Sequence, residues 1–275
     1  MNHVRRGSGK PLLLLHGLGG SRRSWSTILD DLAAHREVIA VDLPGFGETP
    51  PLDGETSIAT LADAVANFLG ERRLLGIDVV GCSMGARLAL ELARRRLVGA
   101  TVALDPGGFW RGWEKHVFVN SIRLSIRLVR ALQPAMPLLT ASAAGRSLLF
   151  AQFSAAPWAI PPDATLDEMR SFAASPSFDE LLESLVFGPP QEGISAALQP
   201  GPIAIGWGRN DLVCFPNQAR RALARFPGAR LHWFERCGHF PQWDRPAETI
   251  RLILETTAGE SAVTPSARST VPAAR

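Results

Sequence analysis

Short apolar runs recur along this chain, and patterns typical of helices separate most of them. The strongest runs are continuously apolar, as expected for strands whose two faces are both covered by helices. Such alternation predicts an α/β protein with a mainly parallel sheet and helices on both faces. The predicted strands are Leu12–Leu15, Val38–Val41, Asp78–Val80, Thr101–Leu104, Ile203–Ile205 and Leu231–Phe234.

The alternation stops after Asp105, and the next 92 residues, 106–197, contain helical patterns and prolines but no strand pattern. Apolar residues three to four positions apart identify helices on both sides of this boundary. The predicted helices are Ser57–Glu71, Met84–Arg96, Arg111–Gln133 and a segment that opens at Ser175-Pro176, a typical helix start, and ends at Phe187.

This pattern predicts two structural parts. Residues 1–105 and 198–258 form an α/β core, and residues 106–197 form a helical cap, or lid, inserted between two of its strands. The remaining residues, 259–275, are dominated by Ser, Thr, Pro, Ala and Arg, so we expect a disordered tail there.

Composition narrows the class of protein and its partners. The 29 Lys and Arg residues nearly balance the 26 Asp and Glu residues, and they are spread along the chain, which argues against a nucleic-acid partner. Three cysteines, an odd number, predict no disulfide framework and fit a reducing compartment. No run reaches the roughly 18 to 20 apolar residues of a transmembrane helix. We therefore expect a cytoplasmic protein without a membrane span.

The segment most informative about chemistry is Val79–Arg87, which reads VVGCSMGAR. A predicted strand runs into Gly-x-Ser-x-Gly, and a predicted helix follows at once, which is the context in which this motif marks a nucleophile elbow. The turn would expose Ser83 at the start of the helix, and the backbone N–H of Met84 would point toward an oxyanion.

A serine nucleophile needs a base and an acid that orients the base. His239 lies in a loop directly after the last predicted strand, and Asp211 follows the strand Ile203–Ile205, so both are placed to meet Ser83. Asp105, which follows the preceding strand, is the alternative acid. His16 is interpreted as a structural residue that holds the oxyanion loop, where the Leu18 amide would be the second oxyanion donor.

The motifs and their order resemble those of the α/β-hydrolase fold family. The matching motifs are His16-Gly17, Asp42-x-x-Gly45-x-Gly47, Gly81-x-Ser83-x-Gly85, Gly208-x-x-Asp211 and Gly238-His239. This resemblance implies a mainly parallel sheet of eight strands or slightly fewer, a lid after the sixth family strand, and no metal or organic cofactor. Because only about ten residues precede the first strong strand, the usual N-terminal hairpin would be reduced to one strand near Val4.

Substrate-binding residues are harder to identify from the sequence. Trp110 and Trp113 leave the strand close to the elbow, and Phe240 follows the candidate base, so we expect these three to line an apolar acyl pocket. Arg87 lies just inside the elbow helix and resembles an arginine that menaquinone-pathway lyases of this fold carry after the elbow. It is a candidate contact for an anionic substrate.

The sequence thus predicts a serine hydrolase of carboxylic esters with an apolar acyl group, acting on a small molecule through an acyl-serine intermediate. Three alternatives stay open at this stage. A thioesterase or a C–C bond hydrolase would use the same machinery. A lyase similar to the succinyl-hydroxycyclohexadiene carboxylate synthases would use Arg87. A non-catalytic binding module would need none of the three residues. The sequence does not indicate an oligomeric state.

Overall fold

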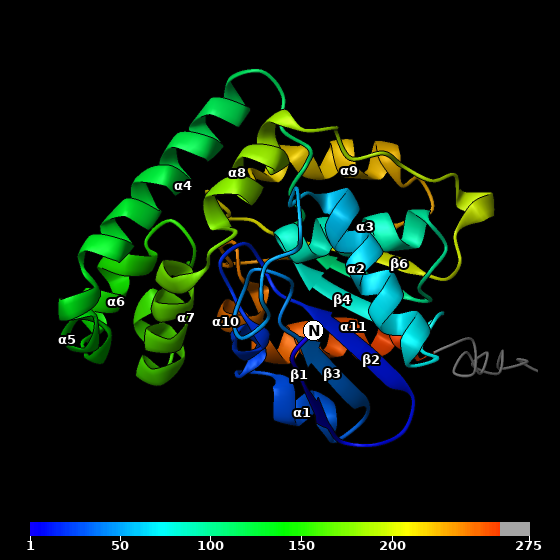
Figure 1. Cartoon of the computed structure of the whole chain (residues 1–275), viewed down its shortest axis with the longest axis horizontal. Helices are drawn as coiled ribbons and strands as arrows, with labels where there is room; N and C mark the ends of the chain where they lie inside the picture. The colour runs from blue at the N-terminus through cyan, green and yellow to red at the C-terminus, as the bar shows by residue number, and fades with distance from the viewer. Residues whose placement is uncertain (259–275) are drawn as a thin grey trace, which may run out of the picture.

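The computed structural model describes residues 1–258, which form one mainly parallel sheet with helices around it (Figure 1). The strands are β1 (His3–Arg6), β2 (Pro11–Leu15), β3 (Glu37–Val41), β4 (Asp78–Cys82), β5 (Thr101–Leu104), β6 (Ile203–Gly208) and β7 (Arg230–Phe234). Their spatial order is β1-β3-β2-β4-β5-β6-β7, and only β1 runs antiparallel to its neighbour.

Helices connect these strands. In the core they are α1 (Leu29–Ala33), α2 (Ile58–Glu71), α3 (Met84–Arg94), α9 (Ala219–Arg225), α10 (Pro241–Asp244) and α11 (Pro246–Thr257). Between β5 and β6 they are α4 (Trp113–Ala131), α5 (Met136–Ala141), α6 (Ala143–Phe150), α7 (Pro162–Ala174) and α8 (Phe178–Phe187). Short 3-10 turns join several of them, at Arg22–Trp25, Gln133–Ala135, Pro157–Ala159, Ala196–Leu198 and Pro216–Gln218.

The central strands are apolar on both faces because both faces are covered. Leu12 to Leu15 of β2 are fully buried, as are all residues of β4. Helix α3 packs against β2, β4 and β5, and α11 packs against β5 and β6. The apolar runs therefore provide the core. Each of the six predicted strands is present and begins within one residue of its predicted start.

Two further predictions about the fold can be compared with the structure. A single N-terminal strand is present at His3–Arg6, so the sheet has seven strands among the described residues. The helix predicted from Ser175 instead begins at Phe178. Ser175 ends α7 with ψ 110°, because the proline that follows it, Pro176, disfavours helical backbone at the preceding residue. The tail predicted at 259–275 lies outside the described residues.

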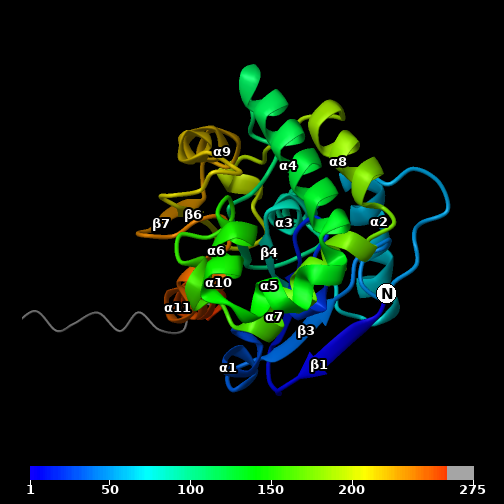
Figure 2. The ribbon, with the colours of Figure 1, turned by 90° about the vertical axis from the view of Figure 1, so that its left-hand side faces the viewer.

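The helices between β5 and β6 gather at one side of the molecule. Figure 1 shows α4, α5, α6 and α7 at the left, and Figure 2, viewed from that side, shows α4 running across the front beside α8. Helix α4 packs on α7 and α8. This group, α4–α8, is called the cap below. No helix in the described part of the chain is long and apolar enough to span a membrane.

Candidate active site

Ser83 occupies a sharp turn between β4 and α3. Its backbone has φ 56° and ψ −115°, a conformation that side-chain-bearing residues rarely adopt. The flanking glycines are required by close packing. A Cβ on Gly81 would lie 2.1 Å from the Gly85 carbonyl oxygen, and one on Gly85 would lie 2.2 Å from that of Leu15. The backbone thus presents Ser83 directly at the N-terminus of α3.

His239 and Asp211 are hydrogen-bonded to one another. The imidazole Nδ1 lies 2.8 Å from Asp211 Oδ2, and both side chains are buried. The other carboxylate oxygen of Asp211 accepts from the backbone amides of Val213 and Cys214, at 2.7 and 3.0 Å. These bonds fix the carboxylate, and the carboxylate in turn fixes the plane and tautomer of the imidazole.

The alternative acid, Asp105, is also buried but does not contact the imidazole. Its Oδ1 accepts from the Gly208 amide at 2.8 Å, and its side chain lies against that of Asp211. Burial and the neighbouring Asp211 both raise the pKa of Asp105 well above its ordinary value. The structure therefore places Asp211, and not Asp105, on His239.

Ser83 and His239 both line an apolar cavity beneath the cap. The rest of its lining consists of Leu18, Phe118, Ile122, Ser125, Ile126, Phe153, Phe172, Phe178, Val213 and Phe240. Six of these side chains come from the cap helices, so the cap closes the cavity over the serine. A carbonyl compound in this cavity would meet the hydroxyl and the imidazole together.

The two expected oxyanion donors lie beside Ser83. Leu18 lines the cavity, and Met84 is the first residue of α3. Neither amide donates to another backbone carbonyl within the residues the structure describes. A helix N-terminus and a free amide both favour negative charge at this position.

His16 holds the loop that carries Leu18. Its Nδ1 lies 2.7 Å from the Gly17 carbonyl, and its Nε2 accepts from the Leu43 amide at 3.0 Å. Burial lowers the pKa of His16 to about 4, so the ring is neutral and can accept and donate at the same time. This agrees with a structural role for His16.

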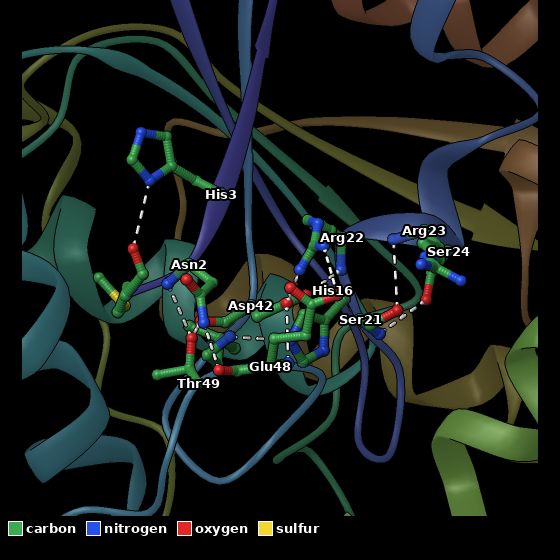
Figure 3. Close-up of polar contacts among 12 residues, drawn as sticks. Asn2, His3, His16, Ser21, Arg22, Arg23, Ser24, Asp42, Glu48 and Thr49 are labelled. Atoms are coloured by element: carbon green, nitrogen blue, oxygen red, sulfur yellow. Dashed lines mark hydrogen bonds and ion pairs between the residues drawn. The ribbon is translucent and has the colours of Figure 1, made fainter.

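Asp42 organises the neighbouring turn, as Figure 3 shows. Its Oδ1 accepts from the Arg22 amide at 2.7 Å, and its Oδ2 accepts from the Glu48 amide at 3.0 Å. The Arg22 guanidinium pairs with the carboxylates of both Asp42 and Glu48. These bonds use both oxygens of Asp42 to hold the turn, and Asp42 is not among the residues that line the cavity.

The structure corrects three of the four expected pocket contacts. Trp113 is 64% exposed and its ring packs near Phe215, because it begins α4 at the outside of the cap. Trp110 packs on Phe118, outside the residues that line the cavity. Phe240 does line the cavity, as expected.

Arg87 does not reach the cavity either. Its guanidinium donates to the carbonyls of Leu185 and Pro189, at 2.8 and 2.6 Å. Burial lowers the pKa of Arg87 to about 10, which leaves it charged at neutral pH. Arg87 therefore ties the end of α8 to α3, and this contact accounts for an arginine after the elbow without an anionic substrate.

Phe118 of α4 is one of the large apolar cap residues that the sequence offers for an acyl pocket, but sequence reasoning did not place Ile122 and Ile126 there. Phe118, Ile122 and Ile126 lie four residues apart and face the cavity from one side of this helix. That spacing was visible in the sequence, but it indicates only that a helix has a buried face. It does not indicate what the face covers.

The backbone of the cap also holds the candidate base. The His239 amide donates to the Phe153 carbonyl at 2.7 Å, although these residues lie far apart in the sequence. No sequence pattern signals this contact.

One group of residues in the described part of the chain has the side chains of a metal site. Donor atoms of Asp211, Cys214 and His239 lie within 4.8 Å of one another. The hydrogen bond between His239 and Asp211 already occupies two of these donors, and burial raises the pKa of the Cys214 thiol well above its ordinary value. A neutral thiol is a poor metal ligand. The grouping therefore fits a hydrogen-bonded acid–base pair better than a metal centre.

Comparison with known proteins agrees with this fold. Residues 12–252 match the Alpha/beta hydrolase family, and the chain belongs to that family. A 2-hydroxy-6-oxononadienedioate/2-hydroxy-6-oxononatrienedioate hydrolase from Pseudomonas putida is 30% identical, over 89% of this chain and 86% of that protein.

Solved structures share the architecture at lower sequence identity. A thermophilic esterase from Thermogutta terrifontis has a TM-score of 0.72 and 20% identity, over 92% of this chain and 91% of that one. The enol-lactonase from Burkholderia xenovorans LB400 has a TM-score of 0.73 and 16% identity, over 94% of this chain and 96% of that one. Identities this low bear on the fold alone.

Proposed function

We propose that this protein is a serine hydrolase that cleaves carboxylic esters with an apolar acyl group. The observation that carries the proposal is that Ser83 and His239 line one apolar cavity, while Asp211 is hydrogen-bonded to the imidazole of His239. Neither a binding module nor a structural protein needs a strained serine, an oriented imidazole and free amide donors in the same place.

The reaction follows from these positions. His239 removes the proton from Ser83 Oγ as the oxygen attacks the ester carbonyl, and the amides of Leu18 and Met84 donate to the resulting oxyanion. Asp211 stabilises the imidazolium. The imidazolium then gives its proton to the departing alcohol, which leaves an acyl group on Ser83. Water, deprotonated by His239, attacks this acyl group; the imidazolium then returns the proton to Ser83 Oγ as the bond from Oγ to the acyl carbon breaks and the carboxylic acid departs.

The lining of the cavity favours an apolar acyl group over an anionic substrate. No lysine or arginine lines it within residues 1–258. The Pseudomonas putida relative acts, by its name, on a dioate, which carries two carboxylates. A carboxylate placed in the cavity of this chain would be desolvated without a cationic partner, which is costly.

C–C bond hydrolysis is the second candidate, because the 30% identical relative is named as a hydrolase of a 2-hydroxy-6-oxo-dienedioate, a compound without an ester bond. Thioester cleavage is compatible with the same chemistry and the same cavity. A lyase that binds an anion through Arg87 is less consistent with the contacts of that guanidinium, which donates to two cap carbonyls.

The proposal is tested by hydrolysis of p-nitrophenyl esters from acetate to palmitate, with wild-type protein, Ser83→Ala and the exposed control Ser26→Ala. We expect turnover by wild type and Ser26→Ala, and a loss on the order of 10³-fold or more in Ser83→Ala. A 2-hydroxy-6-oxo-dienoate substrate is assayed in parallel. Turnover of that compound without ester turnover would favour the second candidate. If folded wild-type protein matched Ser83→Ala on every substrate, the hydrolase proposal would be wrong.

A further inference from the structure

A second carboxyl group lies directly behind the candidate acid. Asp105 follows β5 as Asp211 follows β6, and these strands are neighbours, with Leu104 opposite Gly206. Asp105 is fully buried, and its φ of 46° lies in the left-handed region. A buried carboxyl group on a strained backbone requires an explanation beyond packing.

If Asp105 and Asp211 were both ionised, one oxygen of Asp105 would have no hydrogen-bond donor among residues 1–258. Its Oδ1 accepts from the Gly208 amide, whereas its Oδ2 is buried with no donor among residues 1–258. This side chain lies against Asp211, whose two oxygens accept from the amides of Val213 and Cys214 and from His239. Two ionised carboxylates in this contact would only repel one another.

Among residues 1–258, no lysine or arginine compensates for a negative charge on Asp105 in addition to that on Asp211. The ionisable groups around Asp105 are acids and thiols, namely Asp211, Asp244, Cys82, Cys214 and Cys237. His239 contacts Asp211 instead. The described residues contain no lysine or arginine that pairs with Asp105, and burial raises its pKa further.

We propose that Asp105 is a positioning residue that carries a proton on Oδ2 and donates a hydrogen bond to the carboxylate of Asp211. This inference rests on the proposed function, because it assigns Asp105 a role in the basicity of His239. The protonated group would use both oxygens, since Oδ1 accepts from Gly208 while Oδ2 donates. The extra hydrogen bond would spread the charge of Asp211 and weaken its attraction for the imidazolium.

The test is the direction in which the pH dependence of kcat/KM for an ester shifts when Asp105 is replaced. Asp105→Asn keeps an acceptor for the Gly208 amide and a donor toward Asp211, and asparagine tolerates a positive φ. We expect its kcat/KM for an ester to stay within about 3-fold of wild type, with the acidic limb of the profile unmoved. Asp105→Leu removes the donor. We expect its acidic limb to move to higher pH by about half to one unit, because only part of the effect of one hydrogen bond to Asp211 is transmitted to the imidazole.

An ionised Asp105 predicts the opposite result. Removing a negative charge near the imidazole would destabilise the imidazolium, so the acidic limb would move to lower pH in both variants. That outcome would overturn the proposal. Activity lost in Asp105→Asn but retained in Asp211→Asn would also overturn it, because Asp105 would then be the acid of the site.

A spectroscopic measurement keeps the proposal testable if Asp105→Leu fails to fold or if no ester is turned over. The infrared spectrum of the wild-type protein at pH 8 should contain the carbonyl stretch of a buried protonated carboxyl group. We expect this band to disappear in Asp105→Asn and to persist in Glu168→Gln, which removes the other buried carboxyl with a raised pKa. A spectrum unchanged in Asp105→Asn would contradict the proposal, independently of any activity.

Discussion

Two carboxyl groups follow neighbouring strands, but only Asp211 reaches the imidazole of His239. The contact is direct, at 2.8 Å, and two backbone amides hold the second oxygen of Asp211 in place. At the scale of single residues, the two acids therefore differ in the number of hydrogen-bond donors that contact them. Asp211 has three hydrogen-bond donors, and Asp105 has one.

We expect Asp211→Asn to lower kcat/KM for an ester by about 10³- to 10⁴-fold. Asparagine retains an oxygen for the amides of Val213 and Cys214, so the loop can keep its shape. Its amide nitrogen, however, would donate to His239 Nδ1, fix the wrong tautomer and leave the imidazolium without a counter-charge. Steady-state kinetics and the melting temperature should be measured together. A loss below about 10-fold in a stably folded variant would mean that another group orients the base.

At the scale of elements, α4 has two different faces. Phe118, Ile122 and Ile126 line the cavity, whereas Leu124 and Leu128 lie on the opposite side and are more than half exposed. The helix is therefore both the roof of the pocket and part of the outer surface of the cap. Substitutions on its inner face should change which esters fit.

We expect Ile122→Ala to shift the preference of the enzyme toward longer acyl chains. Removing three carbons from the roof enlarges an apolar pocket, and each methylene that a pocket can hold changes discrimination by about 10-fold or more. The ratio of kcat/KM for a long and a short p-nitrophenyl ester measures this shift. Leu124→Ala, a change on the outer face, is the matched control and should leave the ratio as in wild type. An equal shift in both variants would contradict the assignment of the pocket.

At the scale of elements, some features of this structure could be predicted from the sequence and others could not. The strands and the turn at Ser83 were predictable because local apolar runs and two glycines determine them. The positions of Trp113 and Arg87 were not, because each depends on a helix of the cap. Trp113 lies outside the cavity because α4 begins at the surface. The Arg87 guanidinium is hydrogen-bonded to the carbonyls of Leu185 in α8 and of Pro189 just after that helix.

At the scale of the whole molecule, the cap supports the loops of the site from above. The Ser175 hydroxyl, which lies 2.7 Å from the Ser171 carbonyl, is also 3.3 Å from the Gly19 carbonyl, and the Phe153 carbonyl accepts from the His239 amide. A buried pair adds a third link, in which Ser24 Oγ of the core donates to Glu168 Oε2 of α7 at 2.7 Å. Closing the cap thus positions the oxyanion loop and the base at the same time.

The link between Ser24 and Glu168 should make stability depend on pH. Burial raises the pKa of Glu168 from 4.5 to about 7, because one hydroxyl donor does not replace the water that an ionised carboxylate loses. Between pH 4.5 and about pH 7, Glu168 therefore binds more protons in the folded protein than in the unfolded chain. Its contribution makes the free energy of unfolding fall as the pH rises. Above pH 7 the ionised carboxylate costs on the order of 3 kcal/mol.

We therefore expect Glu168→Gln to raise the melting temperature relative to wild type at pH 8 and to change it little at pH 5. Glutamine keeps an acceptor for Ser24 and carries no charge, so it removes the cost only where Glu168 is ionised. Asp163→Asn, which removes an exposed carboxylate from the same helix, is the control and should show no such difference between the two pH values. Thermal unfolding at both pH values measures the effect. If Glu168→Gln gave the same shift at pH 5 and pH 8, ionisation of Glu168 would not affect the stability of the closed cap.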